Sequence, residues 1–296
     1  MSYRELFVSP PLLFAGFQRT FQESDYIILG IPLDVTSTYR SGSRFAPSSI
    51  REASLNVETY SFRAGFDAEE LRLHDLGDLH VTAEVDETLK RTELVVKEIL
   101  DDKKLPVIIG GEHTLSFGAM RAVGSNTALV SFDAHFDMRD EYMGRTICHA
   151  TFMRRIYEQV KPEKVLEIGV RATCKEEFAY AEKSDVQFLS VQRIRKKGLE
   201  KTVENVANAL IDCKNIYLTI DMDVLDPAFA PAVQNPEPDG LSMHEFLDIL
   251  CSICDNRIVA FDVTEVAPQY DSGTTAIQAA KTIFEVLCHV EKARKA

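Results

Sequence analysis

Short, nearly continuous apolar runs recur along the chain from about residue 26 to its end, and they are rich in residues that favour strands. Such runs are typical of strands buried on both faces of a parallel sheet, because half-exposed strands instead alternate between apolar and polar positions. The pattern predicts strands at residues 26–32, 105–111, 127–133, 164–170, 186–190, 215–221 and 257–263.

Amphipathic segments with helical spacing lie between these runs, at residues 84–102, 150–160, 198–212 and 274–296, and a helix start follows the loop at 34–47. Strands and helices in alternation imply right-handed crossovers. We therefore expect an α/β fold of three layers, with a doubly wound, mainly parallel sheet covered on both sides. No repeat, low-complexity stretch or linker divides the chain, so we expect a single domain spanning residues 1–296.

Four of the predicted strands run directly into acidic or histidine residues. In chain order, these strand ends carry Glu112 and His113; Asp133, His135 and Asp137; Asp221 and Asp223; and Asp262 and Glu265. In an open parallel sheet, ligands bind beyond the carboxyl ends of the strands, so these side chains should converge at one edge.

The spacing within two of these strand ends places several of the charged side chains on one side. Residues two apart in an extended segment point the same way, so Asp133, His135 and Asp137 should all face one pocket, and Asp221 and Asp223 are paired likewise. Buried carboxylates at this density repel one another and are poorly solvated, so they need cations. The predicted metal ligands are His113, Asp133, His135, Asp137, Asp221 and Asp223.

Four carboxylates and two neutral imidazoles carry four negative charges, which two divalent ions would balance. Oxygen-rich ligation with a minority of histidine suits Mn²⁺ better than zinc, although zinc, iron and cobalt remain open. Taken alone, a D-x-H or D-x-D sequence is explained by a turn or a solvated strand end. His113 alone is explained by a cap on a helix beginning near Thr114. Their coincidence at successive strand ends favours the metal site.

Charge and composition exclude several other classes of protein. The 33 basic residues against 46 acidic ones give a net charge of −13, which argues against sequence-independent binding of nucleic acid. The first 20 residues hold one short apolar patch interrupted by prolines, too short for a membrane span and without a signal-peptide layout. We expect a cytoplasmic protein with neither a nucleic-acid nor a membrane partner.

The six cysteines are scattered rather than spaced as a disulfide framework. Cys251 and Cys254 form a C-x-x-C within an apparent helix. We interpret them as buried, reduced thiols, with a redox or zinc role as the alternative.

Seven motifs link these residues to a known family. They are YRSGSRFAPSSIREAS (39–54), GGEHT (110–114), SFDAHFD (131–137), CHATFMRR (148–155), TIDMDVLDPAFAP (219–231), NPEPDGLS (235–242) and DVTEVAPQYD (262–271). In these motifs and their order the sequence resembles the ureohydrolases, the arginases and agmatinases, and the agmatinases most. The resemblance implies an arginase-like fold with two Mn²⁺ per subunit. One ion would be held by His113, Asp133, Asp137 and Asp221, and the other by Asp133, His135, Asp221 and Asp223.

The resemblance also implies the reaction. A guanidinium carbon is a poor electrophile, so two metals would hold one water, lower its pKa and present hydroxide at neutral pH. The expelled amine must be protonated as it leaves. The expected catalytic residues are His149, which would deliver or relay that proton, Glu265, which would pair with the guanidinium, and the ligand Asp137. Taken alone, His149 is also explained as a helix-start histidine, and Glu265 as a helix cap.

The expected substrate is a small cationic guanidine, agmatine, hydrolysed to putrescine and urea. Arginases bind the α-amino and carboxylate groups of arginine with a loop of Asn, Thr and Ser. Here residues 138–148 lack that pattern and carry Asp140 and Glu141, which suit a cationic amine. Besides His149 and Glu265, these two acids are the expected substrate-binding residues. Arg139 has two interpretations, as a partner for a substrate carboxylate or as a surface arginine paired to Asp140 or Glu141.

Two departures from the usual agmatinase pattern, Phe136 in place of Thr and AVQNPEPDG at residues 232–240, are expected to alter the pocket walls. N1-aminopropylagmatine and guanidinobutyrate therefore remain alternative substrates, and arginine is disfavoured. A zinc deacetylase of acetylated amines, which has a single metal, and a metal-binding homologue without activity are the remote alternatives. By resemblance we expect a homo-oligomer, a trimer or hexamer.

Overall fold

The computed structural model describes residues 2–3, 7–9 and 12–296. Part of the N-terminal segment with the short apolar patch, residues 1, 4–6 and 10–11, lies outside the described residues. None of the described helices combines the length and the apolar character that crossing a bilayer requires.

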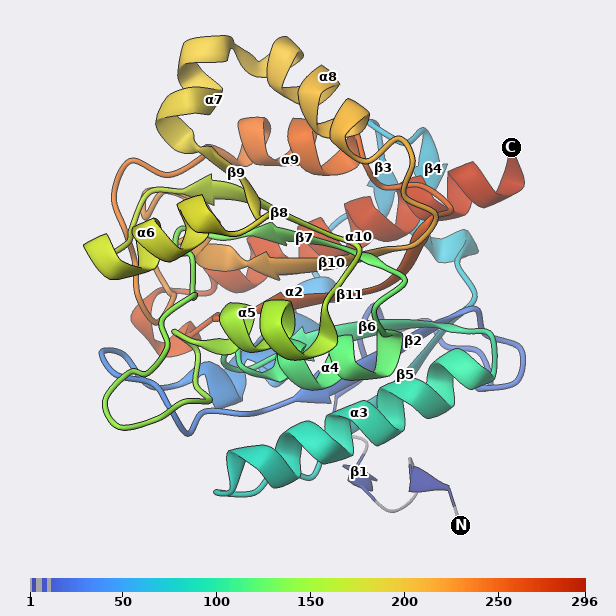
Figure 1. The fold of residues 1–296 in the computed structure, drawn as a ribbon. Coiled ribbons are helices and arrows are strands. Elements are labelled where there is room, and N and C mark those ends of the chain that lie inside the picture. The colour runs from blue at the N-terminus through green and yellow to red at the C-terminus, as the bar shows by residue number, and fades with distance from the viewer. Residues whose placement is uncertain (1, 4–6, 10–11) are drawn as a thin grey trace.

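A nine-stranded sheet forms the centre of the described part of the chain (Figure 1). In spatial order its strands are β1 (Val8–Ser9), β5 (Leu73–Leu79), β2 (Tyr26–Ile31), β6 (Leu105–Gly110), β11 (Ile258–Thr264), β10 (Ile216–Asp221), β7 (Ala128–Phe132), β8 (Lys164–Val170) and β9 (Gln187–Ser190). β1 runs antiparallel to β5, and every other neighbouring pair is parallel. The doubly wound, mainly parallel sheet predicted from the sequence is confirmed. A separate hairpin joins β3 (Tyr60–Ser61) and β4 (Phe66–Asp67).

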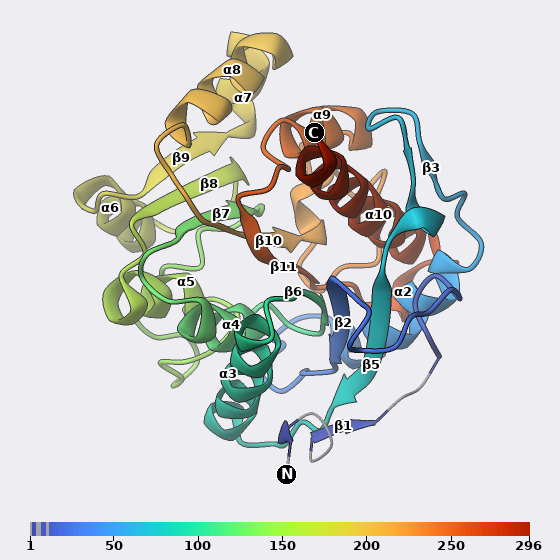
Figure 2. The ribbon, with the colours of Figure 1, turned by 90° about the vertical axis from the view of Figure 1, so that its right-hand side faces the viewer.

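Helices cover both faces of this sheet, as Figure 2 shows, and complete the three layers. One face is covered by α3 (Val85–Asp101), α4 (Leu115–Val123), α5 (Phe152–Arg155) and α6 (Lys175–Lys183). The other face is covered by α2 (Ala46–Ser54), α7 (Val191–Lys197), α8 (Leu199–Ala209), α9 (Met243–Cys251) and α10 (Thr274–Lys295).

Burial on both faces explains the continuous apolar runs. In β2, Ile28 packs into the core under α2 and α10, whereas its neighbours Ile27 and Leu29 pack into the core under α3 and α4. All seven predicted strands are present. The helix predicted at residues 150–160 begins as α5 and continues as a π-helical turn, Ile156–Val160, while α6, α7 and the strands β1, β3, β4 and β5 were not predicted.

The strand order places the charged strand ends side by side. β6, β11, β10 and β7 are consecutive neighbours, and all four are parallel, so their carboxyl ends meet at one edge. At the end of β6, a Cβ on Gly111 would lie 2.0 Å from the carbonyl oxygen of Leu33. Only glycine allows this approach, which brings the loop after β2 against the segment that carries His113.

Candidate metal centre and substrate cavity

The structure brings the six predicted metal ligands close together, and five of them form two overlapping groups. Ligand atoms of His113, Asp133 and Asp221 lie within 4.8 Å of one another, and so do those of Asp133, His135 and Asp223. Asp133 belongs to both groups, which is the arrangement expected of a carboxylate that bridges two ions. The sixth residue, Asp137, has its Oδ2 3.9 Å from Nδ1 of His113.

Backbone amides fix one oxygen of three of these carboxylates. The amide of His135 donates to Oδ1 of Asp133, the amide of Asp223 to Oδ1 of Asp221, and the amide of Ala134 to Oδ1 of Asp223. The other oxygens face the imidazoles: Asp133 Oδ2 and Asp221 Oδ2 lie 3.0 and 3.2 Å from Nδ1 of His113, and Asp223 Oδ2 lies 2.9 Å from Nδ1 of His135. Each carboxylate is thus oriented before any ion binds.

The tautomer of His113 also suits a ligand. Its Nε2 lies 2.7 Å from Oγ1 of Thr219, whose hydroxyl donates to Oδ1 of Asp262 at 2.6 Å. Because that hydroxyl donates to Asp262, Oγ1 accepts a hydrogen bond from Nε2, and Nδ1 is the ring nitrogen left to bind a metal ion or, without one, a proton. Nδ1 is buried without a hydrogen-bond partner among the described residues and points at carboxylate oxygens. A cation between these atoms would satisfy all of them.

The pKa values of the clustered side chains also indicate that this site binds cations. Burial lowers the pKa of His113, but the adjacent Asp133 carboxylate outweighs this and raises it to about 9. Burial and the neighbouring carboxylates raise the pKa values of Asp137 and Asp221 well above their usual range. The carboxylates therefore repel one another and attract protons, and divalent cations would replace those protons.

Beside this cluster lies a cavity of about 240 Å³, lined in part by the ligands themselves and by His149 and Glu265. Glu265 follows β11 with a φ of +67°, in the left-handed region that a non-glycine residue rarely adopts. Its Oε1 accepts the backbone amide of His113 at 2.6 Å, whereas its Oε2 is buried without a partner among the described residues. Burial raises the pKa of Glu265 to about 8.

His149 lies in the wall of the cavity and is held by the loop after β2. Its Nδ1 is 3.1 Å from Oγ1 of Thr36, and its Nε2 is 3.4 Å from Oγ1 of Thr38. The Thr36 hydroxyl donates to Oε1 of the buried Glu112. Burial, reinforced by the nearby His135, lowers the pKa of His149 to about 4, so its imidazole is neutral at neutral pH.

Asp140 and Glu141, expected to bind substrate, do not line the cavity. Asp140 lies on the exposed outer side of its loop, where it pairs with Arg155 at 2.8 Å and with Arg154 at 3.4 Å. The two arginines on α5 thus draw Asp140 away from the cavity. Arg139 lies in the cavity wall instead and packs over the ring of Tyr142 at 5.0 Å, without the predicted pairing to Asp140 or Glu141.

Several residues of the site were not singled out from the sequence, namely Thr36, Thr38, Tyr142, Thr219, Asn235 and Glu237. The carboxylate of Glu237 lies at the cavity wall, with its Oε1 4.0 Å from Nε2 of His135. A signal for Glu237 was present, because it stands inside the NPEPDGLS motif. The threonines gave none, since threonine is common in strands and loops alike.

Residues 24–289 match the family model described as the Arginase family. The chain belongs to the arginase family. It is 36% identical over 282 residues to an agmatinase of Halalkalibacterium halodurans, covering 93% of this chain and 95% of that one. It is 33% identical over 267 residues to an N(1)-aminopropylagmatine ureohydrolase of Thermococcus kodakarensis, covering 89% and 90% of the two chains.

Among solved structures, the agmatine ureohydrolase of Thermoplasma volcanium superposes with a TM-score of 0.89 at 36% identity, covering 99% of this chain and 98% of that one. The arginase-family match and the agmatinase-like relatives make the chain a ureohydrolase, a hydrolase of an arginase-like fold. Members of this family depend on a binuclear metal site, and the two ligand groups described above are candidates for it.

Proposed function

We propose that this arginase-family chain is an agmatinase, which hydrolyses agmatine to putrescine and urea with two Mn²⁺ per subunit. The observation that supports it most directly is Oε2 of Glu265, which has no hydrogen-bond partner in the part of the chain that the structure describes and belongs to a residue of the cavity wall beside the ligand cluster. A buried carboxylate oxygen without a donor is costly, and a guanidinium group supplies the charged N–H donors that would satisfy it.

The donor set fits two divalent ions. His113, Asp133, Asp137 and Asp221 would hold one ion, and Asp133, His135, Asp221 and Asp223 the other. Four carboxylates balance the charge of two such ions, and the predominance of oxygen donors favours manganese. When bound, the two ions would supply a water molecule whose pKa is lowered to near neutrality.

The chain's own residues would orient the substrate and move a proton. Glu265 would fix the guanidinium with its carbon towards the ligand cluster. His149, neutral and with the Nδ1 proton directed to Thr36, offers the lone pair of Nε2. It would accept a proton at Nε2 and return it to the departing amine, which leaves only when protonated.

The outer part of the cavity bears on the choice of guanidine. Glu237 carries a carboxylate there and Arg139 a guanidinium, and neither has a salt bridge to an oppositely charged Arg, Lys, Asp or Glu among the described residues. Glu237 suits the amine of agmatine or of N1-aminopropylagmatine. The position of Arg139 supports a second candidate, guanidinobutyrate, whose carboxylate it would bind. Asp140 and Glu141 are too far out on the loop to be part of this proposal.

The test is urea release by the Mn²⁺-loaded protein from agmatine, N1-aminopropylagmatine, guanidinobutyrate and arginine, with the metal content measured in parallel. We expect two metal ions per chain and the highest kcat/KM with agmatine. Glu237→Gln should raise KM for agmatine, and Arg139→Leu, as the matched change, should not.

A preference for guanidinobutyrate that Arg139→Leu removes would favour the second candidate. No urea from any guanidine would overturn the proposal, and one ion per chain would favour a single-metal deacetylase.

Single-domain organisation over residues 1–296, a cytoplasmic location and assembly into a trimer or hexamer are also part of this proposal. The first rests on the absence of a dividing linker, the second on the composition of the N-terminal segment, and the third on the family resemblance.

A further inference from the structure

A second group of metal-binding side chains lies between α9 and α10 and contains none of the ligands of the proposed manganese centre. A thiol sulfur from Cys251, a carboxylate oxygen from Glu285 and a ring nitrogen from His289 lie within 4.8 Å of one another. Sulfur, nitrogen and oxygen donors in one cluster are typical of zinc sites rather than of manganese sites.

The two helices position these side chains as a unit. Glu285 and His289 are four residues apart on α10, so they lie one above the other on the same face of that helix. Cys251 is the last residue of α9, which packs on the same hydrophobic core as α10. The hydroxyl of Ser61 in β3 donates to Oε2 of Glu285 at 2.6 Å and orients its carboxylate.

We propose that Cys251, Glu285 and His289 bind a thiophilic divalent cation of the zinc class, which links α9 to α10. Three protein ligands leave a fourth tetrahedral position for water. Because the site contains sulfur and the proposed catalytic centre contains only oxygen and nitrogen, the two sites would select different metals. This inference does not depend on the substrate of the enzyme.

Without the ion, each ligand has another partner or an uncharged form, and Nδ1 of His289 lies 2.8 Å from the backbone carbonyl oxygen of Glu285. The ammonium of Lys281 lies 3.1 Å from Oε1 of Glu285 and neutralises that carboxylate. Burial raises the pKa of the Cys251 thiol to about 12, so its sulfur is protonated and uncharged. The ion would displace this proton and the ammonium, and the half-buried Lys281 side chain can turn towards solvent.

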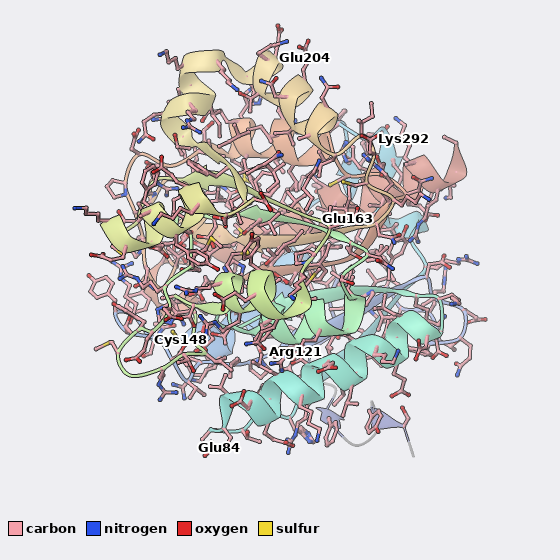
Figure 3. All side chains as sticks on the ribbon, in the orientation of Figure 1. Glu84, Arg121, Cys148, Glu163, Glu204 and Lys292 are labelled. Atoms are coloured by element: carbon pink, nitrogen blue, oxygen red, sulfur yellow. The ribbon has the colours of Figure 1, made fainter. Side chains whose placement is uncertain are left out.

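Cys251 is reached from solvent through a surface hollow. Its lining includes the acids Glu200, Glu204 and Asp248, together with Arg63, whose guanidinium pairs with Asp248 at 2.9 Å. Glu204 projects from α8 at the outside of the molecule (Figure 3). The lining has more acids than bases, which favours the approach of a cation.

The test uses Co²⁺ as a spectroscopic probe of thiolate ligation, added to the full-length Mn²⁺-loaded protein. Binding at this site should produce a sulfur-to-cobalt charge-transfer band in the near ultraviolet, which the oxygen and nitrogen ligands of the other centre cannot give. Cys251→Ser should abolish the band, and Cys174→Ser, a change at the other half-buried thiol, should retain it. Lys281→Met should shift the titration midpoint to lower Co²⁺ concentration, because it removes the competing ammonium.

Zinc should compete for the same site and raise the Tm of the wild-type protein but not that of His289→Asn, which provides a second variant if Cys251→Ser folds poorly. Absence of the band, or a band of unchanged intensity in Cys251→Ser, would overturn the proposal. An unchanged midpoint in Lys281→Met would overturn the role given to the ammonium. None of these outcomes bears on urea release, so the proposed function is tested separately.

Discussion

His113 and His149 are each held by a threonine hydroxyl that itself donates to a buried carboxylate. For His113 the hydroxyl is that of Thr219 and the carboxylate that of Asp262. For His149 they are Thr36 and Glu112. In both cases the carboxylate accepts a hydrogen bond from the hydroxyl, so the threonine oxygen accepts from one ring nitrogen of the imidazole and the opposite ring nitrogen is left to bind a metal ion or a proton. One arrangement thus prepares a metal ligand, and the other a proton acceptor.

The first prediction concerns Thr219. Thr219→Val keeps the shape of the side chain but removes the acceptor for Nε2 of His113, so the ring loses its fixed orientation and tautomer. We expect Mn²⁺ affinity to fall by about 10- to 100-fold, measured by calorimetric titration of the metal-free protein. Thr219→Ser restores the hydroxyl and should restore most of the affinity. Equal affinity in the valine and serine variants would show that the hydroxyl does not position His113.

The second prediction concerns Thr36, which does not belong to the ligand cluster. Thr36→Val should leave the metal content unchanged and lower kcat by about 10²-fold, the lower end of the range for proton transfer by a positioned group, with a smaller change in KM. His149→Ala should lower kcat at least as far. The double variant should be no worse than His149→Ala, because both changes remove the same step. Retained activity in His149→Ala would exclude the relay.

The third prediction tests Glu265. Glu265→Gln keeps an oxygen for the backbone amide of His113 but replaces Oε2, which has no partner among the described residues, by an amide nitrogen that cannot accept from a guanidinium. We expect kcat/KM to fall by about 10²-fold or more, with two Mn²⁺ still bound. The metal content serves as the control, since a loss of metal would assign Glu265 to the integrity of the centre rather than to the substrate.

The candidate ligands could be predicted from the sequence because the rule that locates them is local. An apolar strand followed by alternating acids places those acids at the carboxyl edge of a parallel sheet, whichever strands are neighbours. The role of Thr219 depends on neighbours, because it faces Asp262 only through the pairing of β10 with β11. The outward position of Asp140 depends on Arg154 and Arg155, which the loop sequence does not place.

β5 was missed for a related reason. Its residues are buried at every second position, but one of those positions holds Asp75, so the apolar alternation is broken. The compensating charge is Arg51, which comes from α2, 24 residues earlier in the chain. A buried ion pair between distant segments leaves no periodic signal in the sequence.

The fourth prediction follows from that pair. Arg51 is fully buried, binds both oxygens of Asp75 at 2.8 and 2.9 Å and reaches Oδ1 of Asp78 at 2.5 Å. Arg51→Met would leave the buried carboxylate of Asp75 unpaired and should lower the free energy of unfolding by about 3–5 kcal/mol. Arg72→Met removes the exposed bidentate pair with Asp25 and should cost at most about 1 kcal/mol. Denaturant unfolding of the two variants compares them, and equal losses would contradict this account.

The last prediction concerns pH. The pKa of His113 is raised to about 9, so below that pH its imidazole carries a proton that a metal ion must displace. Mn²⁺ affinity should therefore rise with pH between about 6 and 8, by up to tenfold per unit for each proton released.

In the metal-free protein, the free energy of unfolding should change with pH in the opposite direction. Because the pKa of His113 is higher in the folded than in the unfolded state, its protonation stabilises the fold at any pH below the pKa of the unfolded state, and this contribution is lost as the pH rises through about 9. Mn²⁺ titrations with a pH indicator, paired with thermal unfolding of the metal-free protein, test both signs. Affinity that does not change over this range would mean that His113 is already deprotonated and that the carboxylates do not hold its proton.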